Sequence, residues 1–182
     1  MKNFSATGAL AAVALLVLTG AGAASAATDP ASRAPIPVPT SFVEGVVGAV
    51  NTPGGQLPGA NDWDCRPTAA KPRPVVLVHG TAGGAVTNWG TYGPLLHNEG
   101  YCVFTLTYGA LPGQPWPLSE LGGLDSILEA SVPQVGEFVD RVLAATGHRD
   151  VFGLIRRLFG RDHRQQQIFR RLVPRIFQIR AL

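Results

Sequence analysis

The chain is predicted to be an α/β protein with a partial parallel sheet and helices on its faces. Residues 74–78 (PVVLV) form an apolar, β-branched run that is typical of a strand buried on both faces. Residues 101–108 (YCVFTLTY) also have the composition of a strand. A helical pattern separates the two runs, so the order strand, helix, strand indicates a right-handed βαβ unit.

The first 26 residues are expected to be a cleaved signal peptide. Met1 and Lys2 give a positive start, residues 8–18 form an apolar run, and residues 24–26 (ASA) fit a small-residue cleavage site. The alternative is a retained anchor, but a transmembrane helix needs about 20 apolar residues. We therefore expect a secreted protein whose mature chain begins with an extended, proline-rich arm over residues 27–40.

The partial domain is expected to span residues 41–150. Ser41 is a candidate N-cap for a first helix over residues 42–50. A second helix is predicted over residues 88–98, although Pro94 disfavours its first turns, and Gly100 is its expected stop. The apolar faces are formed by Phe42, Val43, Val46 and Val47 in the first helix and by Trp89, Tyr92, Leu95 and Leu96 in the second.

A long amphipathic helix is predicted over residues 124–146, with a kink at Pro133 and a stop at Gly147. Its apolar side chains recur at helical spacing and should face the sheet. They are Ile127, Leu128, Val135, Phe138, Val139, Val142 and Leu143.

The charge is distributed unevenly along the chain. Residues 1–150 carry a net charge of −4 and residues 151–182 one of +7, which together give the formal net charge of +3. Apolar residues at helical spacing between the arginines of the second segment predict a basic helical tail, broken near residues 161–164 and at Pro174. Such a tail could bind a membrane or another anionic partner; we expect no nucleic-acid partner.

The tail has a second interpretation, which we favour. A rearranged gene, a premature stop after a junction or a misassembled reading frame would each change the sequence abruptly at one point. The sequence changes at residue 151, where another strand of the sheet is expected. The helical pattern of the tail therefore conflicts with the fold that the preceding residues predict. A sheet that stopped at this point would leave an apolar edge unpaired, which is an aggregation risk.

Cys65 and Cys102 are the two cysteines of the chain. An oxidising compartment allows such a pair to bridge, and the alternative is two buried thiols that never meet. The two residues lie too far apart in sequence for the short ligand spacings of a zinc site. No metal or cofactor is therefore expected.

The sequence His79-Gly80-Thr81 directly follows the first strand. Ligands gather at the carboxyl ends of strands in an open α/β sheet. Gly80 lets the backbone approach a substrate closely, and the backbone N–H of Thr81 is a candidate hydrogen-bond donor to an oxyanion. The motif therefore indicates an acyl-transfer site, although His-Gly alone would be a weak signal.

Several separated motifs, in order, resemble the secreted bacterial lipases of the α/β-hydrolase fold. They are residues 61–63 before Cys65, 72–81, 88–89, 100–104, 106–109, 138–140 and 142–147, and the resemblance covers about residues 39–150. It implies hydrolysis of lipid esters, an oxyanion-hole amide at Thr81 in a loop shaped by His79 and Gly80, and a disulfide between Cys65 and Cys102. His79 is then structural and not the general base.

The chain departs from this family after Gly147. The family continues with a strand that ends in a Gly-x-Ser-x-Gly nucleophile turn, followed later by an acid and a histidine. No Gly-x-Ser-x-Gly occurs here, and Ser119, Ser126 and Ser131 fall in or before a predicted helix. Asp162 and His163 are adjacent, so their side chains diverge and cannot form a relay to a distant serine.

The sequence therefore predicts an incomplete, inactive copy of a lipase or esterase with no complete catalytic triad. A function of another class is also open. The chain could be a non-catalytic secreted protein that binds lipid or a membrane through an apolar pocket and its arginine-rich tail.

Overall fold

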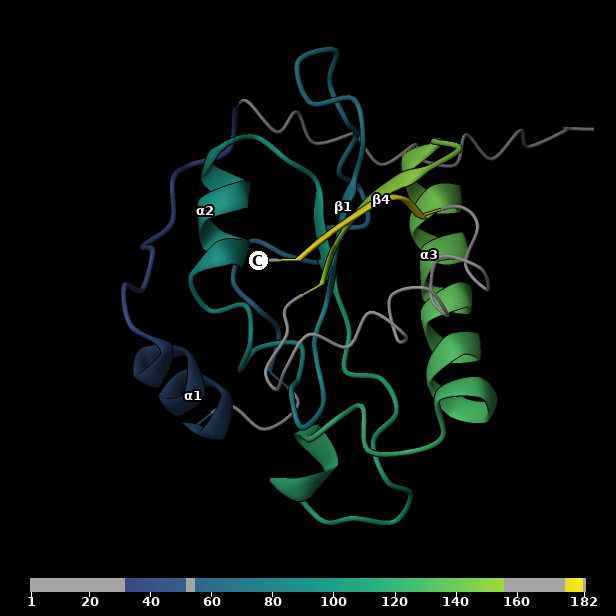
Figure 1. Cartoon of the computed structure of the whole chain (residues 1–182). Coiled ribbons are helices and arrows are strands. Elements are labelled where there is room, and N and C mark those ends of the chain that lie inside the picture. Colours follow the sequence, from purple (N-terminus) through teal and green to yellow (C-terminus); the bar gives the residue numbers. More distant parts are fainter. Residues whose placement is uncertain (1–31, 52–54, 156–175, 182) are drawn as a thin grey trace, which may run out of the picture.

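The computed structural model describes residues 32–51, 55–155 and 176–181 (Figure 1). Its centre is a small parallel sheet in the order β2-β1-β3-β4, with helices on both faces. The strands are β1 (Val75–Val78), β2 (Val103–Thr105), β3 (Val151–Ile155) and β4 (Ile176–Ala181). The predicted α/β class with a parallel sheet is confirmed at this level.

Strand β1 lies between two parallel neighbours, and all four of its residues are buried. Its first residue, Val75, is paired with Val103 of β2 on one side and with Phe152 of β3 on the other. A strand that is hydrogen-bonded on both edges and covered on both faces needs an apolar side chain at every position. This requirement explains the continuous run that predicted the strand.

The two faces of the sheet carry separate apolar cores. Val76 and Val78 pack on one side with side chains of α3 (Val132–Thr146), while Val75 and Leu77 pack on the other with Trp89. Tyr92 and Leu96 of α2 (Tyr92–Asn98) join the second core. Successive strand residues point to opposite faces, so β1 contributes equally to both.

The predicted helices are present, but not all of them begin and end at the predicted residues. α1 (Phe42–Asn51) matches its prediction, whereas α2 begins four residues later than predicted, at Tyr92. Pro94 is the third residue of α2, in the first turn, where the backbone N–H has no partner inside the helix. The proline therefore fixes where this helix can begin.

The long helix is also found, in two parts. A π-helical turn, η3 (Ile127–Ser131), leads into α3, and the change of helix type falls directly before Pro133. Ser126 caps the turn by accepting a hydrogen bond from the N–H of Glu129 (3.2 Å), and Gly147 ends α3 in the left-handed conformation. Val135, Val139, Val142 and Leu143 are buried as predicted, but Leu128 is exposed.

One prediction about the tail is wrong. Residues 151–155 were expected to begin a basic helix, but they form β3, which pairs with β1 along its whole length. The run V-F-G-L-I fits a helical spacing and a buried strand equally well. It forms a strand because it pairs with the otherwise unpaired edge of β1. The sheet therefore continues past the boundary predicted at residue 150.

The remaining tail predictions lie mostly outside the described residues. These include the helical pattern over residues 156–175, as well as the signal peptide and residues 27–31 of the arm. The edge that a sheet stopping before residue 151 would leave unpaired is covered by β3, which pairs with β1, and β4 pairs in parallel with β3 beyond it. Within the described residues, no helix is long and apolar enough to cross a membrane.

The predicted disulfide between Cys65 and Cys102 is present. It lies at the end of the molecule where β1 and β2 begin, and the N–H of Val75 donates to the carbonyl oxygen of Cys102 (2.8 Å). Arg33 of the N-terminal arm reaches the same place and donates to the carbonyl oxygen of Tyr101 (3.1 Å). We call this end of the sheet the amino edge and the opposite end the carboxyl edge.

Candidate functional site

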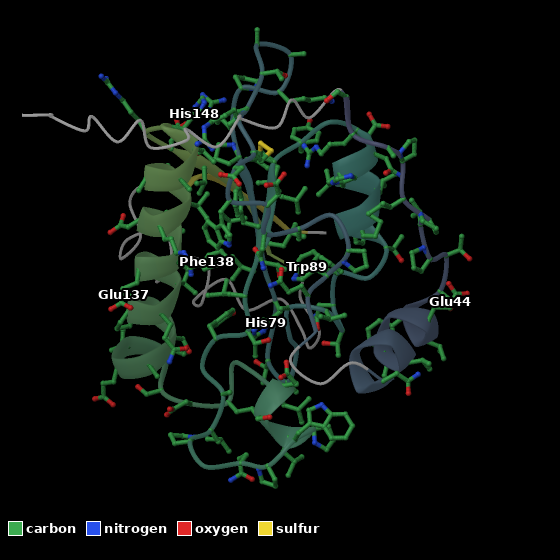
Figure 2. All side chains as sticks on the ribbon, turned by 180° about the vertical axis from the view of Figure 1, so that it is seen from behind. Glu44, His79, Trp89, Glu137, Phe138 and His148 are labelled. Carbon is green, nitrogen blue, oxygen red and sulfur yellow. A yellow bond between two sulfur atoms is a disulfide. The ribbon has the colours of Figure 1, made fainter. Side chains whose placement is uncertain are left out.

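The carboxyl edge brings together three segments that are distant in sequence. β1 leads into the loop 79–85, β2 leads into residues 106–109, and β3 ends at Ile155, which is paired with Val78 at the end of β1. Because the strands are parallel, these segments meet at one edge. Figure 2 shows the His79 side chain inside the molecule at this end.

His79 is completely buried, and both of its ring nitrogens are used. Nε2 accepts a hydrogen bond from the N–H of Tyr108 (3.1 Å), so the ring hydrogen is assigned to Nδ1, which donates to the carbonyl oxygen of Gly80 (2.8 Å). The Tyr108 ring stacks on the imidazole at 4.1 Å between centroids, and its hydroxyl donates to the carbonyl oxygen of His79. His79 thus ties β1 to the segment after β2.

Burial lowers the pKa of His79 to about 4, while the hydrogen bond to Gly80 acts in the opposite direction. The ring is therefore neutral at pH 7. Burial also raises the pKa of the Tyr108 hydroxyl. A neutral imidazole with both nitrogens engaged has no free position from which to take a proton from a substrate. The geometry gives His79 a role in holding the loop.

Thr81 is exposed at the turn of this loop. The hydrogen bonds within the described residues do not include one from its backbone N–H. Gly83 donates to the carbonyl oxygen of Gly80 (3.1 Å) and closes the turn around Thr81. The loop is therefore closed around an N–H from which no described group accepts a hydrogen bond.

Ala82, the next residue, has a φ of 55°. This left-handed conformation costs a residue with a Cβ atom about 1–2 kcal/mol. Backbone strain of this kind persists only where the surroundings impose it, and it concentrates at functional sites. The outlier therefore lies in the same loop as Thr81, directly after it.

Gly122 and Gly123 hold the loop from the other side, and the sequence analysis did not identify them. Gly122 donates to the carbonyl oxygen of Gly83 (2.7 Å), and Gly123 donates to that of Tyr108 (2.7 Å). A Cβ atom on Gly122 would lie 2.5 Å from Cε1 of His79. A Gly-Gly pair signals a turn, but nothing in the sequence indicates its distant partner.

Asn88 and Thr107 fix the far end of the loop. The Asn88 side chain is buried, and its Oδ1 accepts from the N–H of Gly84 (3.2 Å). The Thr107 hydroxyl accepts from the N–H of Ala85 (2.9 Å). The backbone N–H groups of Gly84 and Ala85 are thus satisfied by side chains, which fix the far end of the loop that contains Thr81.

An apolar surface flanks the carboxyl edge. A cavity of about 210 Å³ lies between α1 and residues 116–121, and Figure 1 shows both segments at the end of the molecule toward which β1 runs. The cavity is lined by Val46, Thr87, Trp116, Pro117, Leu118, Glu120 and Leu121. The exposed large apolar side chains of these and adjoining segments are Phe42, Val43, Val47, Leu111, Trp116, Leu118, Leu124 and Leu128.

The three serines considered from the sequence, Ser119, Ser126 and Ser131, are not part of a catalytic arrangement with a histidine in the described residues. Ser126 caps a helical turn, Ser119 lies in the 3-10 turn η2 (Leu118–Glu120), and Ser131 is 1% exposed. None of the three is hydrogen-bonded to a histidine in the described residues, and Asp162 and His163 lie outside them. The described chain also contains no cluster of His, Cys, Asp and Glu that could hold a metal ion.

No protein-family model matches this chain, and no curated protein matches it.

Proposed function

We propose that the chain is an interrupted copy of a secreted carboxylic-ester hydrolase that acts on lipid esters, and that it is itself inactive. The backbone N–H of Thr81 carries this proposal. It is held in a strained, hydrogen-bonded loop at the carboxyl edge and is left without a partner in the described chain. This is the arrangement that stabilises the developing oxyanion of acyl transfer.

Two further features support the substrate class and the compartment. The cavity beside α1 is lined mostly by apolar side chains and offers a surface on which an acyl chain would lose contact with water. The disulfide between Cys65 and Cys102 is typical of exported proteins. Both features are consistent with a secreted protein that acts on lipid.

The first experiment asks whether the Thr81 amide binds an oxyanion. A short-chain fatty-acid carboxylate, the product of ester hydrolysis, is titrated into ¹⁵N-labelled protein. We expect saturable shifts at the amides of Thr81 and Ala82. Thr81→Pro removes the N–H and should abolish these shifts, whereas Thr81→Ala keeps the N–H and should retain them. Shifts scattered over the surface, with Thr81 unaffected, would contradict the proposal.

The second experiment tests the predicted lack of activity. The purified chain is assayed with a chromogenic carboxylic ester and treated with a serine-directed fluorophosphonate. We expect no labelling and no turnover above that of the heat-denatured chain, because the described serines lie outside any catalytic arrangement. Turnover that the fluorophosphonate abolishes would disprove the absence of a nucleophile.

The alternative function, binding of a membrane by the basic tail, is favoured by the net charge of +7 on residues 151–182. Because β3 belongs to the sheet, the test of this alternative leaves residues 151–155 unchanged. Arg170, Arg171 and Arg175 are changed together to Gln, which keeps the chain length. Binding to anionic vesicles that disappears in this variant and in high salt would support the alternative. Equal binding by both proteins, or by neither, would remove it.

A further inference from the structure

We infer that the N-terminal arm is held at the amino edge by a pH-sensitive latch, in which Arg33 of the arm and Gly59 compete for one ring nitrogen of His97. The arm, drawn in purple in Figure 1, runs beside α2. His97 lies in the last turn of α2 and is half-buried. The latch lies at the edge opposite the candidate site, so it does not depend on the proposed function.

The competition follows from two distances to the Nδ1 atom of His97. Nη1 of Arg33 lies 3.2 Å from this atom, and the carbonyl oxygen of Gly59 also lies 3.2 Å from it. A guanidinium only donates hydrogen bonds, whereas a carbonyl oxygen only accepts them. Nδ1 must therefore lack a hydrogen to accept from Arg33 and must carry one to donate to Gly59. A neutral imidazole ring satisfies one of these partners at a time.

Protonation of the ring decides between the two partners. An imidazolium carries a hydrogen on both nitrogens, so Nδ1 then donates to Gly59 and accepts nothing from Arg33. It also places a second positive charge beside the guanidinium, which keeps its own charge at any ordinary pH. Histidine is the side chain that typically changes charge between about pH 5 and about pH 8. Acidification therefore breaks the hydrogen bond between Arg33 and His97.

The other ionisable groups around the end of α2 belong to a separate pair. Glu99, directly after α2, pairs with Lys71 (4.0 Å), and the Lys71 ammonium lies 4.3 Å from the centre of the Tyr101 ring. The segment that carries Gly59, residues 55–60 (GQLPGA), has no ionisable side chain. Arg33 is the charged group that contacts His97 from the arm, and His97 is the member of that pair that titrates near neutral pH.

The remaining contacts of the arm do not involve a histidine. Asn98 accepts from the N–H of Ile36 and donates to the carbonyl oxygen of Ile36, both at 2.9 Å. The Arg33 guanidinium also donates to the carbonyl oxygen of Tyr101 (3.1 Å) and to Sγ of Cys65 (3.4 Å). Protonation of His97 therefore loosens the segment before Ile36, while Asn98 still holds Ile36 itself.

Arg33 provides a direct measure of this loosening. Trypsin cuts after Lys or Arg unless proline follows, and Arg66, Lys71 and Arg73 are each followed by proline. Arg33–Ala34 is therefore the one bond within residues 27–140 that trypsin can cut. When opening and closing are fast, the cleavage rate of such a bond follows the fraction of molecules in which the segment is open.

The deciding experiment is limited trypsin digestion of the full chain at about pH 8 and about pH 5.5, which lie on either side of ordinary histidine titration. Each rate is divided by that for a free peptide of the arm, because trypsin itself depends on pH. We expect cleavage at Arg33–Ala34 to rise about tenfold on acidification. His97→Asn keeps a side-chain acceptor but does not titrate, so it should remove this rise. Asn98→Ala is the matched control, which should speed cleavage at both pH values and keep the tenfold ratio.

Three results would overturn the inference. They are the absence of a rise in the unmodified chain, an equal rise in the His97→Asn variant, and a parallel rise at Arg141–Val142. The last bond lies inside α3, so its cleavage reports unfolding of the domain and not of the arm. NMR gives a second measurement, because the Ala34 amide of ¹⁵N-labelled protein should shift with the same pH midpoint as the His97 ring protons. Different midpoints would contradict the coupling of the arm to His97.

Discussion

The two edges of the sheet are held together by different means. The segments around the first residues of the strands are joined at the amino edge by a disulfide and by the hydrogen bonds of Arg33. An ion pair between Arg73 and Asp150 (3.0 Å) adds a further link there. The carboxyl edge has no covalent link in the described residues. It is held by hydrogen bonds and by close glycine contacts, and it includes the strained Ala82. A covalent bond thus joins segments at the amino edge, whereas non-covalent contacts alone hold the described residues of the carboxyl edge.

The largest expected effect is at the amino edge. Replacing Cys65 and Cys102 together by Ala should lower the free energy of unfolding by about 4 kcal/mol, because the bridge closes a loop of sequence separation 37. Urea unfolding of both proteins measures the loss. The Thr81 amide should keep its chemical shift in the variant at low urea. A shift there would show that the two edges depend on each other.

At the carboxyl edge, Gly122→Ala should cost about 3 kcal/mol or more. The added Cβ atom would lie 2.5 Å from Cε1 and 2.7 Å from Nε2 of the buried His79 ring, which has no room to move. Thermal and urea unfolding give the loss.

Gly136→Ala is the matched control for that substitution. Gly136 lies inside α3, and nothing stands within 4 Å of the added atom. It should stabilise the protein by about 0.5–1 kcal/mol through helix propensity. Equal losses in the two variants would mean that the close contact at Gly122 does not matter.

His79 makes the carboxyl edge sensitive to acid. Its pKa is about 4 in the folded chain against 6.5 in the unfolded one, so the unfolded chain binds more protons between these values. The stabilisation is complete above pH 6.5 and is lost as the pH falls toward 4, by about 3 kcal/mol. Urea unfolding across this range measures it. His79→Gln should make the free energy of unfolding less dependent on pH between pH 4 and 6.5. An unchanged pH dependence in this variant would show that His79 is not its source.

A small effect is expected at Ala82. Ala82→Gly relieves the left-handed strain and should stabilise the protein by about 1 kcal/mol, partly offset by the greater freedom of glycine in the unfolded chain. The same variant should loosen the loop, so hydrogen exchange at the Thr81 amide is the second measurement. Faster exchange with higher stability would show that the strain serves the position of the amide.

Local patterns in the sequence were sufficient for several elements. The run over residues 74–78 predicted β1, because a strand buried on both faces must be apolar throughout. Gly147 marked the end of α3, since its left-handed conformation suits a residue without Cβ. The disulfide followed from the family resemblance together with the parity of the cysteines.

Features that depend on distant partners could not be predicted in this way. Residues 151–155 fit two periodicities, and only the free edge of β1 makes them a strand. The contact of Gly122 with His79 joins segments that local patterns do not relate. Tyr108 was assigned to a strand, but it supplies an N–H and a hydroxyl that hold the His79 loop. Thr81 became the candidate donor from its place directly after the first strand and from the resemblance, and the fold adds that no described residue accepts a hydrogen bond from its N–H.

The pairing of β1 with β3 has a consequence for the order in which the chain folds. Val75 and Phe152 are partners across a long stretch of sequence, so β1 can form hydrogen bonds along its second edge only after nearly the whole domain has been synthesised. Such non-local pairing slows folding, because the entropy of closing the loop is lost before the contact is gained. A nascent chain that has emerged only to residue 150 exposes the central strand, and five more residues are enough to cover it.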